Sequence, residues 1–316
     1  MHNKRTGVRG CPSGGEVEIL EAIRRRAQFP ASQGLALGIG DDCAIYRQRG
    51  AREDLLFTTD LLVEDVHFRH RTHPPEALGH KALARGLSDI AAMGGVPRFC
   101  LLSLAAGRQT DRRWIDRFYA GLLRLARISR VPLAGGDLAR AAQTACDIVV
   151  CGAVPRGGAL RRDGARAGDA IYVSGRLGGS ALGLESGTGK AWLRHLRPPP
   201  RLALGVWLRE RLGATAAMDL SDGLSMDLRR LALASGLEAA IEPPPRFPGA
   251  SPGQALHGGE DYELLFTVRP RAQVPARFGS IPLTRIGVMR RGRPGAVYLS
   301  GKPLPALGYD HFRGSR

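Results

Sequence analysis

Ala217-Met218-Asp219-Leu220-Ser221-Asp222-Gly223-Leu224 places two carboxylates and a hydroxyl within four consecutive positions. An apolar run ends at Leu220, and leucines then recur at Leu224, Leu228 and Leu231 with the spacing of a helix. A corner between a strand and a helix exposes backbone N–H groups and directs short acidic side chains to one point. The stretch therefore predicts such a corner, with its polar residues facing a binding site.

Short acidic motifs recur at four other places in the chain. Three are expected at strand ends and one on a helix, in the order Gly40-Asp41-Asp42, Thr58-Thr59-Asp60, Gly135-Gly136-Asp137 and Leu87-Ser88-Asp89. Open α/β sheets bind ligands beyond strand ends, and oxygen donors without Cys or His suit Mg²⁺. The competing interpretation is that each Asp beside a Gly serves only a turn or a cap. Because the motif recurs, we expect these carboxylates to converge around divalent metals that carry the phosphates of ATP.

Length and composition favour a globular protein of two domains. The 316 residues allow a sizeable core, and 43% hydrophobic with 24% charged residues is ordinary for a soluble chain. No apolar run reaches the ~18 residues of a membrane span. The five cysteines form no CxxC pair, which favours buried, reduced thiols over a disulfide framework or a zinc site. We expect a cytoplasmic protein without membrane contact.

A formal net charge of +17 raises the alternative of a nucleic-acid-binding protein. The excess is almost all arginine scattered through expected helices and loops, and only 6% of residues are aromatic. Single-strand binders interleave basic and aromatic residues, and this pattern is absent from the sequence. The acidic motifs would also repel nucleic-acid phosphates, so we expect no nucleic-acid partner.

Strand-like and helix-like segments mix in both halves, which predicts an α/β fold with mixed α+β sheets. We place a disordered basic tail at residues 1–15, an N-terminal ATP- and metal-binding domain at 16–155 and a C-terminal domain at 156–316. Local patterns also predict the following features: a helix from Pro74 to about Met93, a helix capped by Thr110, and strands at Val131–Leu133 and Tyr262–Val268.

Three apparent motifs do not support the functions that they suggest. Gly187-Thr188-Gly189-Lys190 ends like a P-loop, but Leu184 replaces the required first glycine and Ala191 replaces Ser or Thr. Gly38-Ile39-Gly40 lacks the third glycine of a dinucleotide fingerprint. His67, His70 and His73 have arginines between them, which suits an anionic group better than zinc.

Seven motifs together resemble one family of kinases. In chain order they are GIGDDCA from Gly38, TTDLLVEDVHF from Thr58, KALARGLSDIAAMG from Lys81, GGD from Gly135, MDLSDGL from Met218, GGEDYEL from Gly258 and GYDHF from Gly308. The chain is similar to the thiamine-monophosphate kinases, whose fold is shared with aminoimidazole ribonucleotide synthetase and selenophosphate synthetase. The resemblance implies an N-terminal domain that dimerises through its sheet and a C-terminal domain that closes the cleft.

The resemblance also implies an activity and the residues that carry it. The activity is ATP-dependent, Mg²⁺-assisted phosphorylation of thiamine monophosphate to thiamine diphosphate by direct in-line transfer. The implied metal ligands are Asp42, Thr58, Thr59, Asp60, Asp89, Asp137, Asp219 and Asp222. Asp60, Asp137 and Asp222 are expected to be catalytic. The implied ATP contacts are Gly136, Asp137, Arg162, Ser221 and Tyr119, and the implied thiamine monophosphate contacts are His67, Glu260 and Tyr309.

The chain departs from the family pattern at three places. Leu138 and Ala139 follow GGD where the family usually has hydroxyl residues, so those side chains cannot contact a phosphate. His257 replaces a commonly small residue, and the basic tail before Glu16 is additional. The other enzymes of the superfamily remain the alternatives for function, although Cys11 lacks the sequence context of a selenophosphate synthetase.

Overall fold

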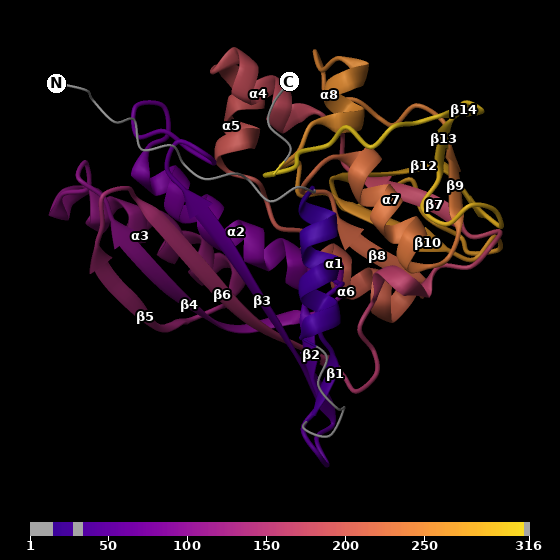
Figure 1. Ribbon diagram of the computed structural model, residues 1–316, viewed down its shortest axis with the longest axis horizontal. Helices are drawn as coiled ribbons and strands as arrows, with labels where there is room; N and C mark the ends of the chain where they lie inside the picture. The colour runs from indigo at the N-terminus through magenta and orange to yellow at the C-terminus, as the bar shows by residue number, and fades with distance from the viewer. Residues whose placement is uncertain (1–14, 28–33, 313–316) are drawn as a thin grey trace, which may run out of the picture.

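The computed structural model of the chain describes residues 15–27 and 34–312. Two sheets with flanking helices form the molecule, one from each half of the chain (Figure 1). This mixed α/β architecture confirms the predicted fold class. The predicted basic tail and Cys11 lie outside the described residues, apart from Gly15. The other four cysteines are buried and unpaired with one another.

The first half of the chain forms the six-stranded sheet, in the order β1-β2-β3-β6-β4-β5. Its elements are α1 (Glu16–Arg26), β1 (Leu35–Leu37), β2 (Ala44–Tyr46), β3 (Glu53–Val63), α2 (Pro75–Ala92), β4 (Val96–Ala106), α3 (Arg112–Ser129), β5 (Leu133–Arg140) and β6 (Ala145–Pro155). β4 pairs with β5 in parallel, whereas β3, β6 and β4 pair antiparallel. α2 and α3 pack together and cover one face of this sheet (Figure 1).

The second half forms the eight-stranded sheet, whose main path is β14-β13-β9-β12-β7-β10-β8, with β11 paired to β12. Its strands are β7 (Ala170–Ser174), β8 (Ala216–Asp219), β9 (Glu238–Ile241), β10 (Leu264–Val268), β11 (Arg277–Phe278), β12 (Ile281–Arg290), β13 (Val297–Leu299) and β14 (Lys302–Pro303). Its helices are α4 (Gly179–Ser186), α5 (Gly189–Leu196), α6 (Leu202–Trp207), α7 (Leu224–Ala234) and α8 (Pro252–His257).

α2 belongs to the cores of both halves and thereby fixes the site between them. Leu83, Leu87 and Ile90 pack into the core under the first sheet. Ala91 and Ala92 pack instead with residues of β10 and α6 in the second half. Because the helix is buried along most of its length, its few charged side chains need partners from the surrounding elements.

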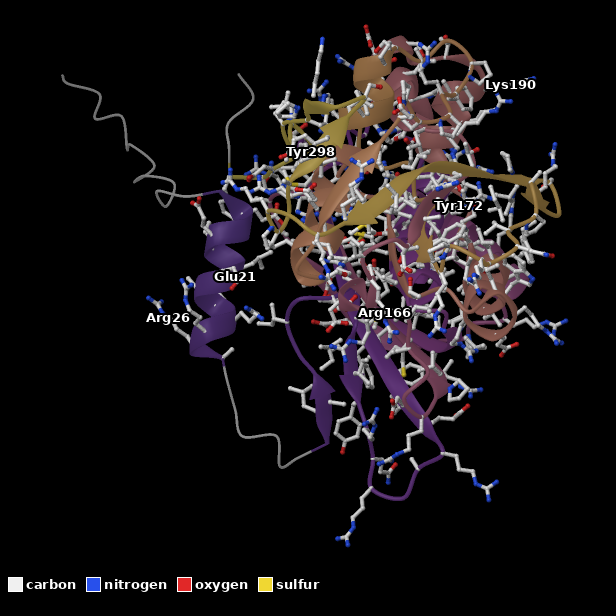
Figure 2. The ribbon with its side chains drawn as sticks, turned by 90° about the vertical axis from the view of Figure 1, so that its right-hand side faces the viewer. Glu21, Arg26, Arg166, Tyr172, Lys190 and Tyr298 are labelled. Atoms are coloured by element: carbon white, nitrogen blue, oxygen red, sulfur yellow. The ribbon has the colours of Figure 1, made fainter. Side chains whose placement is uncertain are left out.

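α1 lies at one edge of the molecule, as Figure 2 shows where Glu21 and Arg26 are labelled. The backbone N–H of Glu16 donates to Oδ1 of Asp310 at 3.2 Å, so the helix begins against the C-terminal segment. That segment is held in turn by the N–H of Tyr309, which donates to the carbonyl of Asp222 at 3.0 Å. The C-terminal motif is therefore docked beside the predicted corner.

Two acidic motifs lie inside strands, which corrects the expectation that they end strands. β3 continues beyond Asp60 to Val63, and β5 runs through Asp137 to Arg140. Asp60 is paired there with Arg85 of α2, and Asp137 is exposed on β5, so neither polar residue ends its strand. The first sheet is also mainly antiparallel. The site is therefore not built on a row of parallel strand ends.

Three local predictions were wrong in detail. Asp111, not Thr110, caps α3 by accepting a hydrogen bond from the N–H of Trp114 at 2.7 Å. The predicted strand at Val131–Leu133 begins only at its last residue. β10 begins at Leu264 because Glu260 and Tyr262 adopt positive φ angles of 63° and 47°, which a strand excludes. The predicted helix from Pro74 to about Met93 is confirmed as α2.

Among the described residues, none of the helices is both long enough and apolar enough to cross a membrane.

Candidate active site

Three predicted carboxylates meet between the two halves of the molecule. Asp42 comes from the loop before β2, Asp89 from α2 and Asp219 from the end of β8, and one oxygen from each lies within 4.8 Å of the others. Ser88 donates a hydrogen bond to Oδ2 of Asp219 at 2.8 Å, and Thr58 donates to Oδ2 of Asp89 at 2.5 Å. The predicted convergence of carboxylates is thus observed for these three, with Thr58 beside them.

The electrostatics of this acidic cluster call for a cation. Burial, followed by the charge of Asp219, raises the pKa of Asp89 well above its usual range. Burial and the charge of Asp42 raise the pKa of Asp219 to about 7. Oδ2 of Asp42 is buried without a hydrogen-bond partner among the described residues. An all-oxygen set with an unpartnered oxygen fits a hard divalent cation such as Mg²⁺.

Arg162 is the cation that the structure places against this cluster. Its guanidinium donates to Oδ1 of Asp42 at 2.5 Å, and its backbone N–H donates to Oδ2 of Asp41 at 3.1 Å. It lies on the 3₁₀ turn Arg162–Gly164, which packs against β8 and α7. The predicted ATP contact Arg162 therefore adjoins the carboxylates that are expected to bind metal.

The predicted corner carries Ser221 and Asp222 and holds a second motif in place. Gly223 begins the turn into α7 with a φ of 103°, a conformation that favours glycine. The N–H of Glu260 donates to the carbonyl of Ser221 at 2.7 Å, so the Gly-Gly-Glu motif docks on the corner. Asp222 forms an ion pair with Arg230 of α7. His257, one of the departures from the family pattern, contacts Ser225 at 2.8 Å.

Glu260 lies in a buried network that joins the two halves. Nζ of Lys81, a fully buried residue of α2, lies 2.8 Å from Oε1 of Glu260, and Nδ1 of His195 lies 3.4 Å from Oε2. His73 and His195 contact each other through their Nε2 atoms at 3.2 Å. Burial alone would raise the pKa of Glu260, but Lys81, His195 and Arg85 together lower it to about 2. Glu260 is therefore a fixed negative charge at neutral pH.

His67 presents a hydrogen-bond donor toward the same region. Its Nδ1 accepts from the N–H of Val63 at 3.1 Å, so in the neutral ring the proton resides on Nε2. Nε2 is buried and has no partner among the described residues. Burial, with the charges of Arg85 and His311, lowers the pKa of His67 to about 4, so the ring is neutral at pH 7.

Tyr309 and the docked C-terminal segment complete this side of the site. The ring of His311 lies 5.1 Å from His67 and 4.7 Å from Tyr309. Burial and the charge of Glu260 raise the pKa of Tyr309, which places its hydroxyl in the electrostatic field of that carboxylate. The structure thus brings together the three residues predicted to contact thiamine monophosphate, namely His67, Glu260 and Tyr309.

Not all predicted residues share this space. Thr59 faces the opposite side of β3 from Thr58 and donates to Oδ1 of Asp147 at 2.6 Å. Asp137 is exposed on β5 and accepts the N–H of its neighbour Leu138 at 2.9 Å. Asp137, Gly136 and Tyr119 line a separate hollow of about 580 Å³ beside α3. The structure thus does not bring the side chains of Thr59 and Asp137 to the acidic cluster.

The spaced histidines point to different partners, in keeping with the interpretation against zinc. Nε2 of His70 contacts Oγ1 of Thr144 at 2.9 Å, whereas His73 contacts His195. In the described part of the chain, the acidic cluster is the single group of His, Cys, Asp and Glu close enough to share an ion.

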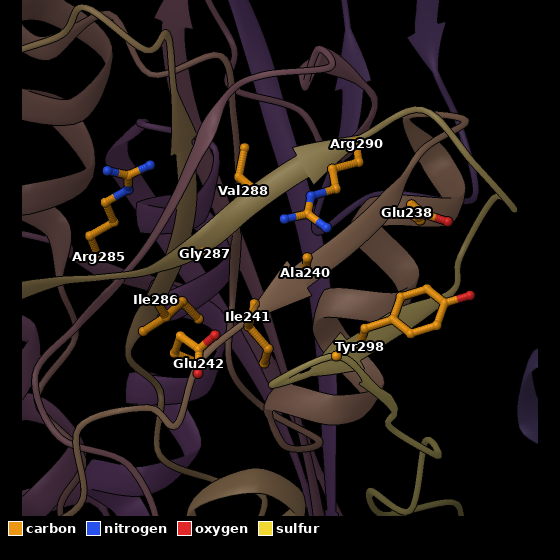
Figure 3. Close-up of a pocket in the computed structure, with 11 residues that line it drawn as sticks. Glu238, Ala240, Ile241, Glu242, Arg285, Ile286, Gly287, Val288, Arg290 and Tyr298 are labelled. Carbon is orange, nitrogen blue, oxygen red and sulfur yellow. The ribbon is translucent and has the colours of Figure 1, made fainter.

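A second hollow of about 580 Å³ lies on the outer part of the eight-stranded sheet (Figure 3). Arg285 and Arg290 of β12, Glu238 of β9 and Tyr298 of β13 line it. None of the residues predicted from the sequence lines this hollow, so it is not the candidate site.

Sequence reasoning missed several residues that hold the predicted ones in place, among them Ser88, Lys81, Arg85, His195 and Arg230. Ser88 and Lys81 stood within a quoted motif, and their spacing from Asp89 placed them on the same helix. His195 and Arg230 carried no sequence signal, because their partners lie 65 and 8 positions away in the chain.

Comparisons with known proteins show which family the chain resembles in sequence and in fold. Residues 40–155 match the family model for AIR synthase related protein, N-terminal domain. Thiamine-monophosphate kinase of Bacillus subtilis (strain 168) is 33% identical, covering 94% of this chain and 99% of its own length. Thiamine-monophosphate kinase of Escherichia coli (strain K12) is 38% identical over 87% of this chain and 92% of its own. The solved structure of AaThiL complexed with AMPPCP and TMP matches with a TM-score of 0.83 at 32% identity, covering 94% of this chain and 97% of that one.

Proposed function

The chain belongs to the thiamine-monophosphate kinase family, and we propose that it transfers the γ-phosphoryl group of ATP to thiamine monophosphate. The product is thiamine diphosphate. The observation that carries the proposal is the acidic cluster of Asp42, Asp89 and Asp219 adjoining a docked Glu260. The relative AaThiL, which was solved with AMPPCP and TMP, supports the same pair of substrates.

Asp42, Asp89 and Asp219, with the hydroxyl of Thr58, would hold Mg²⁺. When bound, Mg²⁺ neutralises charge on the carboxylates and on the nucleotide phosphates. Arg162 lies beside these carboxylates and would contact the same phosphates. The proposed roles of Asp60, Asp137 and Asp222 as further metal ligands rest on the family resemblance, as do those of Ser221, Gly136 and Tyr119 in ATP binding and the presence of several ions. Thr59 is not proposed as a ligand, because its side chain lies on the opposite face of β3 from Thr58.

The acceptor needs no general base. A phosphate monoester has a second pKa near ~6, so thiamine monophosphate is mostly a dianion at neutral pH. The neutral His67 would donate from Nε2 to this phosphate instead of removing a proton. We therefore propose direct in-line transfer without a phosphorylated enzyme.

Charge repulsion is then the main barrier that the site must lower. At ~4 Å, two unit charges of like sign repel by about 4 kcal/mol at an effective dielectric of ~20. The chain supplies Arg162 near the nucleotide side and the Nε2–H of His67 near the acceptor side. Their fixed positions reduce the reorganisation required during transfer.

Glu260 would bind the positively charged ring of thiamine. Its carboxylate is fixed by Lys81 and by the corner, and its low pKa keeps it charged across the physiological range. Tyr309 would pack against the ring beside it. A carboxylate with an aromatic neighbour is a suitable receptor for an organic cation.

We also propose a homodimer formed through the uncovered face of the six-stranded sheet. Apolar residues alternate along this face, and Leu61 of β3 remains 50% exposed. Two rows of paired residues cross this face from β3 through β6 to β4. The first row is Phe57, Cys151 and Phe99, and the second is Thr59, Val149 and Leu101. We expect Leu61→Asp to shift the protein from dimer to monomer in analytical ultracentrifugation. A monomeric wild-type protein, or a variant that stays dimeric, would contradict this interface.

The function is tested by following ATP and thiamine monophosphate in the presence of Mg²⁺. We expect thiamine diphosphate and ADP in equal amounts, and no labelled protein when the reaction with γ-labelled ATP is quenched within one turnover. ADP release that depends instead on the substrates of selenophosphate or aminoimidazole ribonucleotide synthesis would overturn the proposal. A phosphorylated residue that forms and decays at the rate of turnover would overturn direct transfer.

A further inference from the structure

Arg85 is a largely enclosed cation of α2 that has no role in the proposed mechanism. Its Nε donates to Oδ2 of Asp60 at 2.8 Å, its second guanidinium nitrogen pairs with Oδ1, and its third contacts the carbonyl of Leu61 at 3.2 Å. The side chain is only 13% exposed. Arg85 lies one helical turn from Lys81 and one turn from Asp89, so it separates the thiamine side from the acidic cluster.

This pairing conflicts with the role expected of Asp60. Arg85 engages both carboxylate oxygens of Asp60. Neither oxygen is therefore free to bind a metal ion. A bidentate pair with a guanidinium is a strong, well-oriented interaction. Asp60 therefore becomes available to a cation only if Arg85 finds another anionic partner.

The surroundings of Arg85 show what that partner would be. Arg85 and His67 lie beside the same end of β3, because Arg85 contacts the carbonyl of Leu61 at 3.2 Å and Nδ1 of His67 accepts from the N–H of Val63 at 3.1 Å. The Nε2–H of His67 is buried without an acceptor among the described residues. The carboxylate of Glu260, on the other side, is already held by Lys81. A phosphate placed between Arg85 and His67 would satisfy both donors at once, and a guanidinium matches phosphate geometry as well as it matches a carboxylate.

We propose that Arg85 exchanges Asp60 for the phosphate of thiamine monophosphate when a metal ion takes Asp60. The exchange rests on the proposed function, because the anion is the acceptor of that reaction. The guanidinium is a competitor of the metal before substrate binds and a ligand of the substrate afterwards. It therefore couples the two binding events, and by linkage each one strengthens the other.

The experiment measures both events in Arg85→Met. We expect the KM for thiamine monophosphate to rise about tenfold to hundredfold, as for the loss of hydrogen bonds to a charged group, with the KM for ATP nearly unchanged. Mn²⁺ binding measured by calorimetry without substrate should tighten by about threefold or more, because the competitor for Asp60 is gone. The mutual strengthening of metal and substrate binding should be lost.

The matched control is Arg117→Met, since Arg117 forms a similar bidentate pair with Glu76 at the start of α2, at 2.6 and 3.0 Å. It should alter neither the KM for thiamine monophosphate nor Mn²⁺ affinity. Arg85→Lys separates geometry from charge and also serves if the Met variant does not fold. If Arg85 exchanges partners as proposed, lysine restores little of the substrate affinity, because an ammonium group cannot form the two parallel hydrogen bonds of a guanidinium.

Three results would overturn the exchange: an unchanged KM for thiamine monophosphate, an unchanged Mn²⁺ affinity, or full rescue by lysine. A wild-type protein that makes no thiamine diphosphate would instead refute the proposed function. The two failures are therefore distinguishable, because the second is read from the wild type alone.

Discussion

The two ends of α2 differ in how the negative charges beside them are compensated. At the end near Asp89, three carboxylates crowd together and the pKa values of Asp89 and Asp219 rise, so that end depends on a cation brought from solution. At the end near Lys81, the chain supplies its own counterion, and the pKa of Glu260 falls. The difference separates a part of the site that is complete before any ligand arrives from a part that is not.

The end of α2 near Lys81 can be disrupted by removing the counterion that the chain itself supplies to Glu260. Lys81→Met leaves Glu260 without its buried partner, and removing one member of a buried pair is expected to cost about 3–5 kcal/mol of folding stability. The KM for thiamine monophosphate should rise as well, since Glu260 loses its fixed position. Thermal and urea unfolding with steady-state kinetics measure both effects.

The double variant Lys81→Met with Glu260→Gln is the control for this end. It removes the unpaired charge, so it should recover part of the lost stability without recovering the KM. A Lys81→Met protein as stable as the wild type would show that Glu260 does not depend on its internal counterion.

The incomplete end should respond in the opposite way. Asp219→Asn removes a ligand, and we expect kcat to fall by about 10²–10³, the usual loss when one stabilising group of a transition state is removed. The metal-free protein should not lose stability, because the variant also relieves repulsion within the acidic cluster. Differential scanning calorimetry in a chelator checks the second point.

Asp116→Asn is the control for a surface carboxylate, because Asp116 pairs with Arg112 on the exposed side of α3. It should leave kcat unchanged. A loss of kcat below about threefold in Asp219→Asn would remove that residue from the metal site.

The acidic end of α2 should also make the stability of the metal-free protein depend on pH. The pKa of Asp219 is about 7 in the folded protein and near 3.8 when exposed. A raised pKa contributes stability below about pH 4 that is lost as pH rises through about 7, so the metal-free protein should weaken across this range. Mg²⁺ replaces the lost proton, and the rise in Tm that it causes should grow between about pH 6 and pH 8.

Asp219→Asn should reduce this pH dependence without abolishing it, because burial and the charge of Asp42 also raise the pKa of Asp41 to about 7. A Tm response to Mg²⁺ that is independent of pH would show that the acidic cluster is already deprotonated without metal.

The sequence was sufficient to predict what depends on local pattern. Pro74, Pro75 and Glu76 located the start of α2, and the acidic motifs identified Asp42, Asp89 and Asp219 as residues that meet. Glu260 and Tyr309 were predicted as substrate contacts because their motifs resemble those of the family. Such residues can be predicted because the residues that reveal their role are their neighbours in the sequence.

What the sequence could not provide were the partners chosen by tertiary packing. The ion pair of Arg85 with Asp60 joins residues 25 positions apart, and the contact of Lys81 with Glu260 joins the two halves of the molecule. The sequence also could not show which face of β3 packs against α2. Adjacent strand residues always face opposite sides, but only the packing of α2 shows that Thr58 faces the acidic cluster and Thr59 does not.

The opposite orientation of Thr58 and Thr59 on β3 gives the comparison with the smallest expected effect. Thr58→Val removes the hydrogen bond to Asp89 and should lower kcat/KM by about threefold to tenfold, as for one hydrogen bond to a charged acceptor. Thr59→Val removes only the hydrogen bond to Asp147 on the other face and should change kcat/KM by less than about twofold. The two substitutions are identical in chemistry and adjacent in sequence, so they differ only in the face that they alter. A large loss in Thr59→Val would mean that the metal site reaches the uncovered face of the sheet, and the acidic end of α2 would then extend into the proposed dimer interface.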